Sequence, residues 1–260
     1  MRTRDLIDLA NNPNFISGIH NYCDRWCERC PFTSRCMVYA MESEEPAASP
    51  SRDIRNAEFW RGLTSVFQQT KDLITVWADE HNVELFPSSL DSVAEEKSLR
   101  RMNARTDALS SEAEDYAFAV SKWFDEEFTT LETVSDSSEY SDDEDDETEN
   151  VSDALEVIRW YQFLIAAKIV RAVLSREDED EDNREGARDS DGCIKVALIA
   201  IDRSVSAWRL MLLARPDLFD SILPFLLRLE RLRLSTEKEF PDARDFIRAG
   251  FDEACVGLIN

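Results

Sequence analysis

SDALEVIRWYQFLIAAKIVRAVLS, residues 152–175, is the stretch that decides the fold. When it is drawn as an α-helix, apolar side chains occupy nearly every position around it, so we expect a central helix that other helices bury. Its length would suit a membrane span, but charged side chains are costly inside a bilayer, and we therefore expect no span. The interrupting residues are Glu156, Arg159, Lys168 and Arg171.

Helical spacing recurs on both sides of this segment. In 53–80, apolar residues repeat at steps of three and four, as on the buried face of an amphipathic helix. Segment 110–134 begins with Ser/Glu spacing suited to capping a helix. Further helices are predicted at 193–214, at 217–234 and, as a short element, near 242–254. Pro224 predicts a kink or break. No stretch shows period-2 alternation, so we predict an all-α helical bundle of about five longer helices.

Two acidic runs break the helical pattern. Residues 135–150 hold nine acidic side chains and no basic one, and residues 177–191 hold nine against two arginines. Such runs repel themselves and have little apolar surface to bury, so we expect disordered, solubilising loops at 135–150 and 176–191. They supply most of the formal net charge of −24. No basic patch compensates for them, so nucleic acid is not an expected partner.

The order of these features divides the chain into parts. Residues 1–45 form a cysteine-rich module, which the linker ESEEPAASPS separates from the rest. A helical region at 52–134 precedes the first acidic loop, and we expect a second helical region, 151–260, to pack against it. The N-terminal residues MRTRDLIDLANNP lack the apolar core of a signal peptide, which favours a cytoplasmic protein without a membrane span.

The segment NYCDRWCERCPFTSRC, residues 21–36, holds four of the six cysteines of the chain. Cys23, Cys27, Cys30 and Cys36 have the spacing C-x3-C-x2-C-x5-C. Thiols stay reduced in the cytoplasm, so these cysteines are expected to bind a metal rather than to form disulfides. Four thiolates suit either tetrahedral zinc or a [4Fe–4S] cluster. Structural zinc sites usually draw ligands from two distant knuckles, whereas all four thiols here lie on one loop, which favours the cluster.

Part of this segment, CERCPFTSRC, resembles the iron–sulfur loop of endonuclease III-like DNA glycosylases, including the adenine-specific branch. That family has the spacing C-x6-C-x2-C-x5-C, often with proline directly after the third cysteine. Cys27, Cys30 and Cys36 match the last three ligands. Pro31 follows the third, whereas Cys23 lies three residues nearer than the first ligand of the family. The resemblance covers about fourteen residues of 260 and lacks the helix-hairpin-helix element and catalytic Lys/Asp context. It implies a [4Fe–4S] cofactor and gives no support for DNA repair.

Apolar side chains alternate with the cysteines in this segment. They are Tyr22, Trp26, Phe32 and Met37. Side chains of this kind exclude water from a cofactor and thereby tune its potential. They also attach a loop to a helical bundle, and we expect both roles here.

A polar stripe crosses the otherwise apolar helix predicted at 193–214. Its residues are Lys195, Asp202, Ser206 and Arg209. At ~100° per residue they lie within about 60° of one another. If this helix faces Lys168 and Arg171, the two helices form a buried ion network or a pocket for a small anion. A solvated face with internal pairing is the interpretation we favour, and Arg203, on another side, is expected to form a separate salt bridge.

The sequence therefore predicts a cytoplasmic all-α protein whose four clustered cysteines bind a [4Fe–4S] cluster for a structural role, redox sensing or electron transfer. A second interpretation is a zinc-stabilised module for protein–protein interaction, in which the acidic loops contact a protein partner. A third is an enzyme that binds a small anion with Lys195, Asp202 and Arg209. The chain has no P-loop, dinucleotide-binding fingerprint or nucleophile elbow, so the third is the least favoured.

Overall fold

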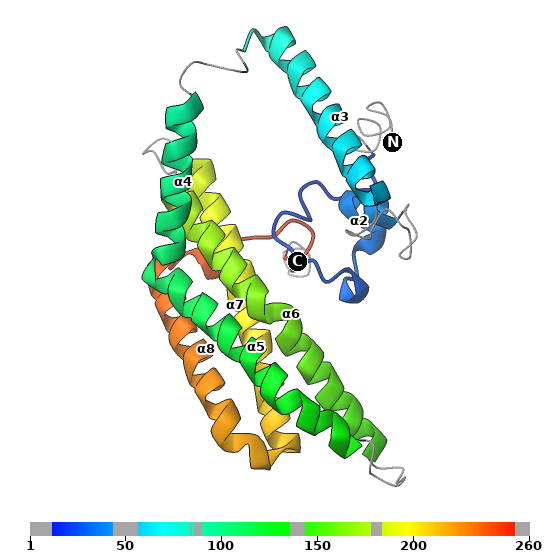
Figure 1. Cartoon of the computed structure of the whole chain (residues 1–260), viewed down its shortest axis with the longest axis vertical. Coiled ribbons are helices and arrows are strands. Elements are labelled where there is room, and N and C mark those ends of the chain that lie inside the picture. The colour runs from blue at the N-terminus through cyan, green and yellow to red at the C-terminus, as the bar shows by residue number, and fades with distance from the viewer. Residues whose placement is uncertain are drawn as a thin grey trace, which may run out of the picture. The chain divides into compact units, whose positions relative to one another are not determined.

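The computed structural model describes residues 12–43, 57–83, 85, 90–135, 144–177 and 184–252. Every regular element in these ranges is helical, which confirms the predicted all-α fold (Figure 1). The α-helices are α2 (Met37–Ser43), α3 (Ala57–His81), α4 (Leu90–Thr106), α5 (Ala108–Ser135), α6 (Glu144–Glu177), α7 (Arg184–Ala214) and α8 (Phe219–Glu239). As expected, no helix in the described part of the chain is long and apolar enough to cross a membrane.

The chain forms two compact units, which we call the N-terminal unit and the bundle unit. The N-terminal unit comprises Met1–Asn21, Arg25–Glu96 and Ala249–Asn260, and the bundle unit comprises Tyr22–Asp24 and Lys97–Arg248. One boundary falls within α4, and another runs through the cysteine segment. By its contacts, Cys23 therefore belongs to the bundle unit, whereas Cys27, Cys30 and Cys36 belong to the N-terminal unit.

Helices α5, α6, α7 and α8 lie side by side in the bundle unit (Figure 1). Helix α6 packs along α7, α8 packs on α7, and α5 contacts both α6 and α8. Large side chains that are fully buried between these helices include Ile158, Ile165, Ile169, Ile194, Leu198, Ile201, Met211, Ile222 and Leu229. Removal of this apolar surface from water is the main force that holds the helices together.

Helix α7, rather than α6, is the most enclosed helix of the bundle. From Cys193 to Ile201, all residues except Lys195 and Ile199 are buried. The expectation that residues 152–175 are buried on all sides was wrong, because Trp160 and Phe163 of α6 are 37% and 48% exposed. The physical reason is the number of neighbours: α7 packs against α6, α8 and the 3-10 turns that flank α8, whereas α6 packs against α5 and α7.

An aromatic cluster fills one part of this core. Trp208 stacks on Phe225, with ring centroids 4.8 Å apart, and meets Trp123 edge to face at 5.1 Å. The indole Nε1 of Trp208 donates a hydrogen bond to the hydroxyl oxygen of Tyr116 at 3.1 Å. Burial raises the pKa of Tyr116 far above its usual value, because the ionised phenolate would lose its hydration.

The structure corrects the predicted starts of two helices. Helix α6 begins at Glu144 and α7 at Arg184, so parts of the loops predicted at 135–150 and 176–191 are helical. The remainders, 136–143 and 178–183, lie outside the described residues. Acidic composition suggested a loop, but acidic residue types also favour the first turns of a helix because of its macrodipole.

Two further elements differ from the expectation. Helix α4 was not predicted, because its sequence, LDSVAEEKSLRRMNART, has no continuous apolar face. The short helix predicted near 242–254 is only a 3-10 turn at Ala243–Asp245 within the described residues, which end at 252. Phe246 is extended and Gly250 has a φ of +77°, and both conformations stop a helix. Helix α8 continues through Pro224 without a break.

Helix α3 belongs to the N-terminal unit and has a defined end. Asn82 takes the left-handed conformation at φ 53°, and the N–H of Val83 donates to the Ala78 carbonyl at 2.9 Å, which closes the last turn. The apolar residues whose spacing predicted this helix are exposed along much of its length. Trp60 and Phe67, for example, are 52% and 66% exposed.

Candidate cofactor site around the cysteine segment

The cysteine segment folds as a series of tight turns rather than as one helix. The 3-10 turns Cys27–Arg29 and Thr33–Arg35 are followed by α2. The N–H groups of Cys30 and Cys36 close these turns by donating to the carbonyls of Cys27 and Thr33, at 3.2 Å each. Pro31 disfavours helical backbone at Cys30, which is extended and ends the first turn, and the extended Cys36 ends the second. All four cysteines of the segment are half-buried.

One sulfur of the segment accepts a hydrogen bond from the backbone. The backbone N–H of Phe32 donates to Sγ of Cys30 at 3.4 Å. Cysteine sulfur is a soft ligand that binds iron–sulfur clusters and zinc. In this respect the segment fits a thiolate-ligated cofactor. Nevertheless, no three histidine, cysteine, aspartate or glutamate side chains converge closely enough to hold a metal ion in the part of the chain that is described.

The rest of the segment packs within the N-terminal unit. Trp26 is only 5% exposed, and the Arg29 guanidinium lies 4.2 Å from the centroid of its ring. Phe32 meets Phe251 edge to face at 5.1 Å. Ile16 donates its backbone N–H to the carbonyl of Arg35 at 3.0 Å, which joins the start of the described chain to the second 3-10 turn. Phe32 therefore packs within its own unit, which differs from the expected attachment to the helical bundle.

Tyr22, which precedes Cys23, is seated on α7. A Cβ atom at Gly192 would lie 2.3 Å from Cε1 of Tyr22, so the ring occupies the space that only a glycine leaves open. The Tyr22 hydroxyl donates to Asp189 Oδ1 at 3.1 Å, and its ring meets Phe246 edge to face at 4.7 Å. Burial, together with the Asp189 carboxylate, raises the pKa of Tyr22 to about 12.

Asp24, which follows Cys23, is held by α6 and α7. Its Oδ2 accepts a hydrogen bond from the Tyr161 hydroxyl at 2.8 Å and another from Arg203 Nη1 at 2.7 Å. Arg203 also donates to the Tyr161 hydroxyl, and the indole Nε1 of Trp160 donates to the Asp24 carbonyl at 3.0 Å. Burial and the Asp24 carboxylate raise the pKa of Tyr161 to about 12. The salt bridge expected for Arg203 is thereby confirmed, with Asp24 as the partner.

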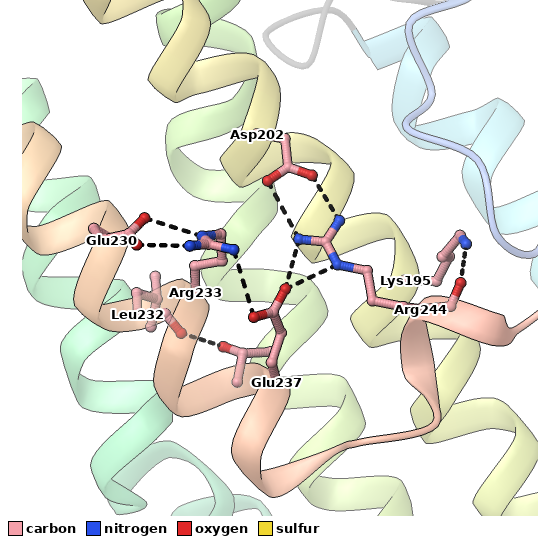
Figure 2. Close-up of polar contacts among 8 residues, drawn as sticks. Lys195, Asp202, Glu230, Leu232, Arg233, Glu237 and Arg244 are labelled. Atoms are coloured by element: carbon pink, nitrogen blue, oxygen red, sulfur yellow. Dashed lines mark hydrogen bonds and ion pairs between the residues drawn. The ribbon is translucent and has the colours of Figure 1, made fainter.

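Lys195 and Asp202 of the predicted polar stripe share one partner, Arg244. Asp202 pairs with Arg244, Nη1 to Oδ2, at 2.6 Å, and Lys195 donates to the carbonyl of Arg244 (Figure 2). Arg244 also reaches Glu237 of α8 at 2.8 Å. Hydrogen bonding to Asp202 raises the pKa of Arg244 above its usual value. Arg209 is exposed.

The two cations of α6 that were grouped with this stripe lie elsewhere. Arg171 forms an ion pair with Asp189 at 3.1 Å, and Ser175 donates to the same carboxylate at 2.9 Å. Lys168 is half-buried. Arg171 and the Tyr22 hydroxyl therefore contact the same carboxylate, that of Asp189. Lys195 and Asp202 instead contact Arg244.

Sequence reasoning missed the residues that contact Tyr22 and Asp24. Asp24 and Tyr161 are separated by 137 positions, and a contact of this kind leaves no local periodic signal. Gly192 gave one weak hint, because a glycine inside an apolar helix often marks the close approach of another group.

No family model, curated protein or solved structure matches the chain. The chemistry of the cysteine segment and its contacts are therefore what supports a function.

Proposed function

We propose that the cysteine segment binds a [4Fe–4S] cluster through Cys23, Cys27, Cys30 and Cys36. The observation that carries this proposal is the concentration of four half-buried thiols within fourteen residues, one of them accepting a backbone N–H bond. Soft thiolate ligands select iron–sulfur clusters and zinc over harder cations. Of these two cofactors, the spacing of the cysteines on one loop and the position of Pro31 favour the iron–sulfur cluster.

The chain's own residues would supply all the ligands. When bound, such a cluster supplies either a rigid cross-link or a one-electron redox couple. Trp26 and Phe32 alternate with the ligands in the sequence and would restrict water around a bound cofactor, which would set the polarity of the site. Because four protein thiolates leave no open ligand position, we propose structural, redox-sensing or electron-transfer use in the cytoplasm rather than substrate chemistry.

Zinc is the second candidate, because four thiolates also satisfy its tetrahedral geometry. In that case the segment would be a structural module for interaction with another protein, and the acidic regions around residues 135–150 and 176–191 would be its contacts with a basic partner. Use as an enzyme has less support, because Asp202 and Arg171 are engaged in ion pairs with Arg244 and Asp189.

Visible absorption and competition with zinc distinguish the iron–sulfur cluster from the zinc module. Full-length protein reconstituted anaerobically with iron and sulfide should become brown and bleach on reduction, and equimolar zinc should not displace the iron. Protein that stays colourless under these conditions but retains zinc through gel filtration would overturn the cluster and support the zinc module. Protein that retains neither would overturn both.

A further inference from the structure

Helix α3 of the N-terminal unit presents a broad apolar stripe. Its large side chains are 39–66% exposed and belong to Trp60, Phe67, Leu73, Ile74 and Trp77. At ~100° per residue they lie within about 140° of one another, the width of a face that a helix normally buries. No described element of the N-terminal unit packs along α3. Because packing of the apolar face supplies most of the stability of such a helix, the stripe needs a partner surface.

The apolar positions of α3 follow a heptad repeat. One row of positions, seven residues apart, holds Trp60, Phe67 and Ile74, and a second row, three residues further on, holds Leu63, Thr70 and Trp77. These are the a and d positions of a helix that packs along another helix in a coiled coil. We propose that α3 packs against α3 of a second copy of this chain, in antiparallel orientation. This inference does not depend on the proposed cofactor.

The charge of α3 argues against a membrane surface as the partner. Amphipathic helices that lie on membranes are rich in lysine and arginine on their polar face, which attract anionic lipid. The sequence of α3 instead holds four acidic side chains against one lysine and one arginine. Anionic lipid would therefore repel this helix, whereas another protein helix would not.

The area of the stripe suits a dimer of this chain. A buried aromatic side chain removes about 150–250 Å² from water, so the five partly exposed side chains offer about 500 Å² per helix. Two copies would then bury about 1,000 Å² together, which reaches the lower limit for a specific interface. A two-fold axis would bring the same stripe of each copy into contact, as in most homodimers.

Antiparallel packing places complementary side chains in each layer of the interface. The layers across the two copies are then Trp60 with Trp77, Leu63 with Ile74, and Phe67 with Thr70. The large Phe67 thus faces the small Thr70, and large and small side chains facing each other fill space well. Parallel helices would instead place Phe67 against Phe67 and would leave two threonines facing each other in the next layer.

The charges at the end of α3 favour the same orientation. Asp79 and Glu80 lie in the last turn of the helix. In an antiparallel pair they come beside the N-terminus of the other α3, where the helix macrodipole favours negative charge. In a parallel pair the acidic ends of the two copies would lie together and repel each other.

Phe67→Glu tests the interface, and Phe118→Glu is its matched control. The two phenylalanines are 66% and 63% exposed, but Phe118 belongs to α5 of the bundle unit. Sedimentation equilibrium of the full-length wild type, in reducing buffer that prevents intermolecular disulfides, should give a dimer dissociation constant below about 10 µM. Phe67→Glu should raise this constant at least about a hundredfold, because a symmetric interface holds two copies of each residue. Phe118→Glu should match wild type.

Two results of this experiment would overturn the proposal. One is wild-type protein that remains monomeric at about 100 µM, as expected if the bundle unit or a different protein covers the stripe. The other is a wild-type dimer that Phe67→Glu and Phe118→Glu weaken equally.

Photo-cross-linking tests the orientation and leaves most of the stripe intact. The full chain is made with p-benzoyl-phenylalanine in place of Trp60 and irradiated, and mass spectrometry identifies the linked peptide. The expected product is a dimer linked to the peptide that holds Trp77. These positions lie about 25 Å apart along a single helix, so the link cannot form within one copy. A link to the peptide around residue 60 would overturn the antiparallel arrangement, and a link to the bundle unit would overturn the α3 interface.

Discussion

Arg203 and Asp24 form an ion pair in which Nη1 lies 2.7 Å from Oδ2, and this pair joins α7 to the residue directly after Cys23. Arg203 is half-exposed, so the pair alone contributes little to stability. Tyr161 strengthens the arrangement, because its hydroxyl donates to Asp24 and accepts from Arg203. Asp24 is therefore held within the bundle unit by a small polar network rather than by apolar packing alone.

Replacing a proposed ligand should remove the cofactor without unfolding the bundle. Cys30→Ser should reduce the iron bound after anaerobic reconstitution by at least about tenfold, because a serine hydroxyl is a hard, protonated ligand. Elemental analysis of the purified variant measures this loss.

Cys193→Ser is the control for this experiment. Burial raises the pKa of Cys193 to about 11, so the thiol is protonated at neutral pH and unsuited to bind metal. This variant should keep the iron content of wild type. Equal iron in the Cys30→Ser variant would contradict the ligand assignment.

Alkaline pH should destabilise the bundle through Tyr161. Its pKa is raised to about 12 in the folded protein, against about 10 in an unfolded chain. Between these values the unfolded state has released the proton and the folded state has not, so the free energy of unfolding falls as pH rises. Below pH of about 10 this contribution is fully present.

The Tyr161→Phe variant isolates this contribution. Urea unfolding across the alkaline range should show that the free energy of unfolding of the variant falls less steeply with pH than that of wild type. The difference in slope corresponds to at most about one bound proton. The difference in stability between variant and wild type should be constant at lower pH. Parallel curves throughout the alkaline range would show that Tyr161 does not titrate as stated.

Tyr116→Phe should destabilise the core by about 1–3 kcal/mol, because it leaves the buried Trp208 N–H without its acceptor. Tyr39→Phe is the surface control, since Tyr39 is 37% exposed, and its effect should stay within about 0.5 kcal/mol. Urea denaturation gives both values. Equal stability of the two variants would mean that the Trp208–Tyr116 hydrogen bond contributes nothing.

Arg244→Gln should lower the free energy of unfolding by about 1 kcal/mol, since it breaks the pairs with Asp202 and Glu237 that join α7 to α8 (Figure 2). The loss should shrink in about 1 M salt, which screens half-exposed charges. Lys122→Gln breaks an isolated, more exposed pair with Glu126 and should cost less than about 0.5 kcal/mol. A salt-independent loss in Arg244→Gln would argue for packing instead of charge.

Local signals in the sequence predicted much of the fold. The repeats of apolar residues that mark α5, α7 and α8 arise from burial of one helical face, which is readable without a structure. The same kind of spacing predicted α3, although many of its apolar residues are exposed. Helix α4 escaped prediction because its exposed Leu99 and Met102 and its many charges form no such face. The start of α6 escaped because acidic residues are compatible both with a loop and with a helix N-terminus.

The candidate site was predictable only in part. The spacing of the four cysteines is local and could be read directly, whereas the contacts of Tyr22 and Asp24 beside Cys23 join residues that are far apart in the sequence. Nothing near Asp24 in the sequence points to Tyr161 or Arg203. The polar stripe illustrates the same limit: Lys195 and Asp202 do share a helical side, but their partner Arg244 comes from a turn beyond α8.

Iron and acid-labile sulfide should be measured in the full chain purified under strictly anaerobic conditions, with zinc determined in the same sample. About four iron and four sulfide per chain, with little zinc, is the expected result for a [4Fe–4S] cluster held by Cys23, Cys27, Cys30 and Cys36. Stoichiometric zinc without sulfide, or no metal at all, would contradict it.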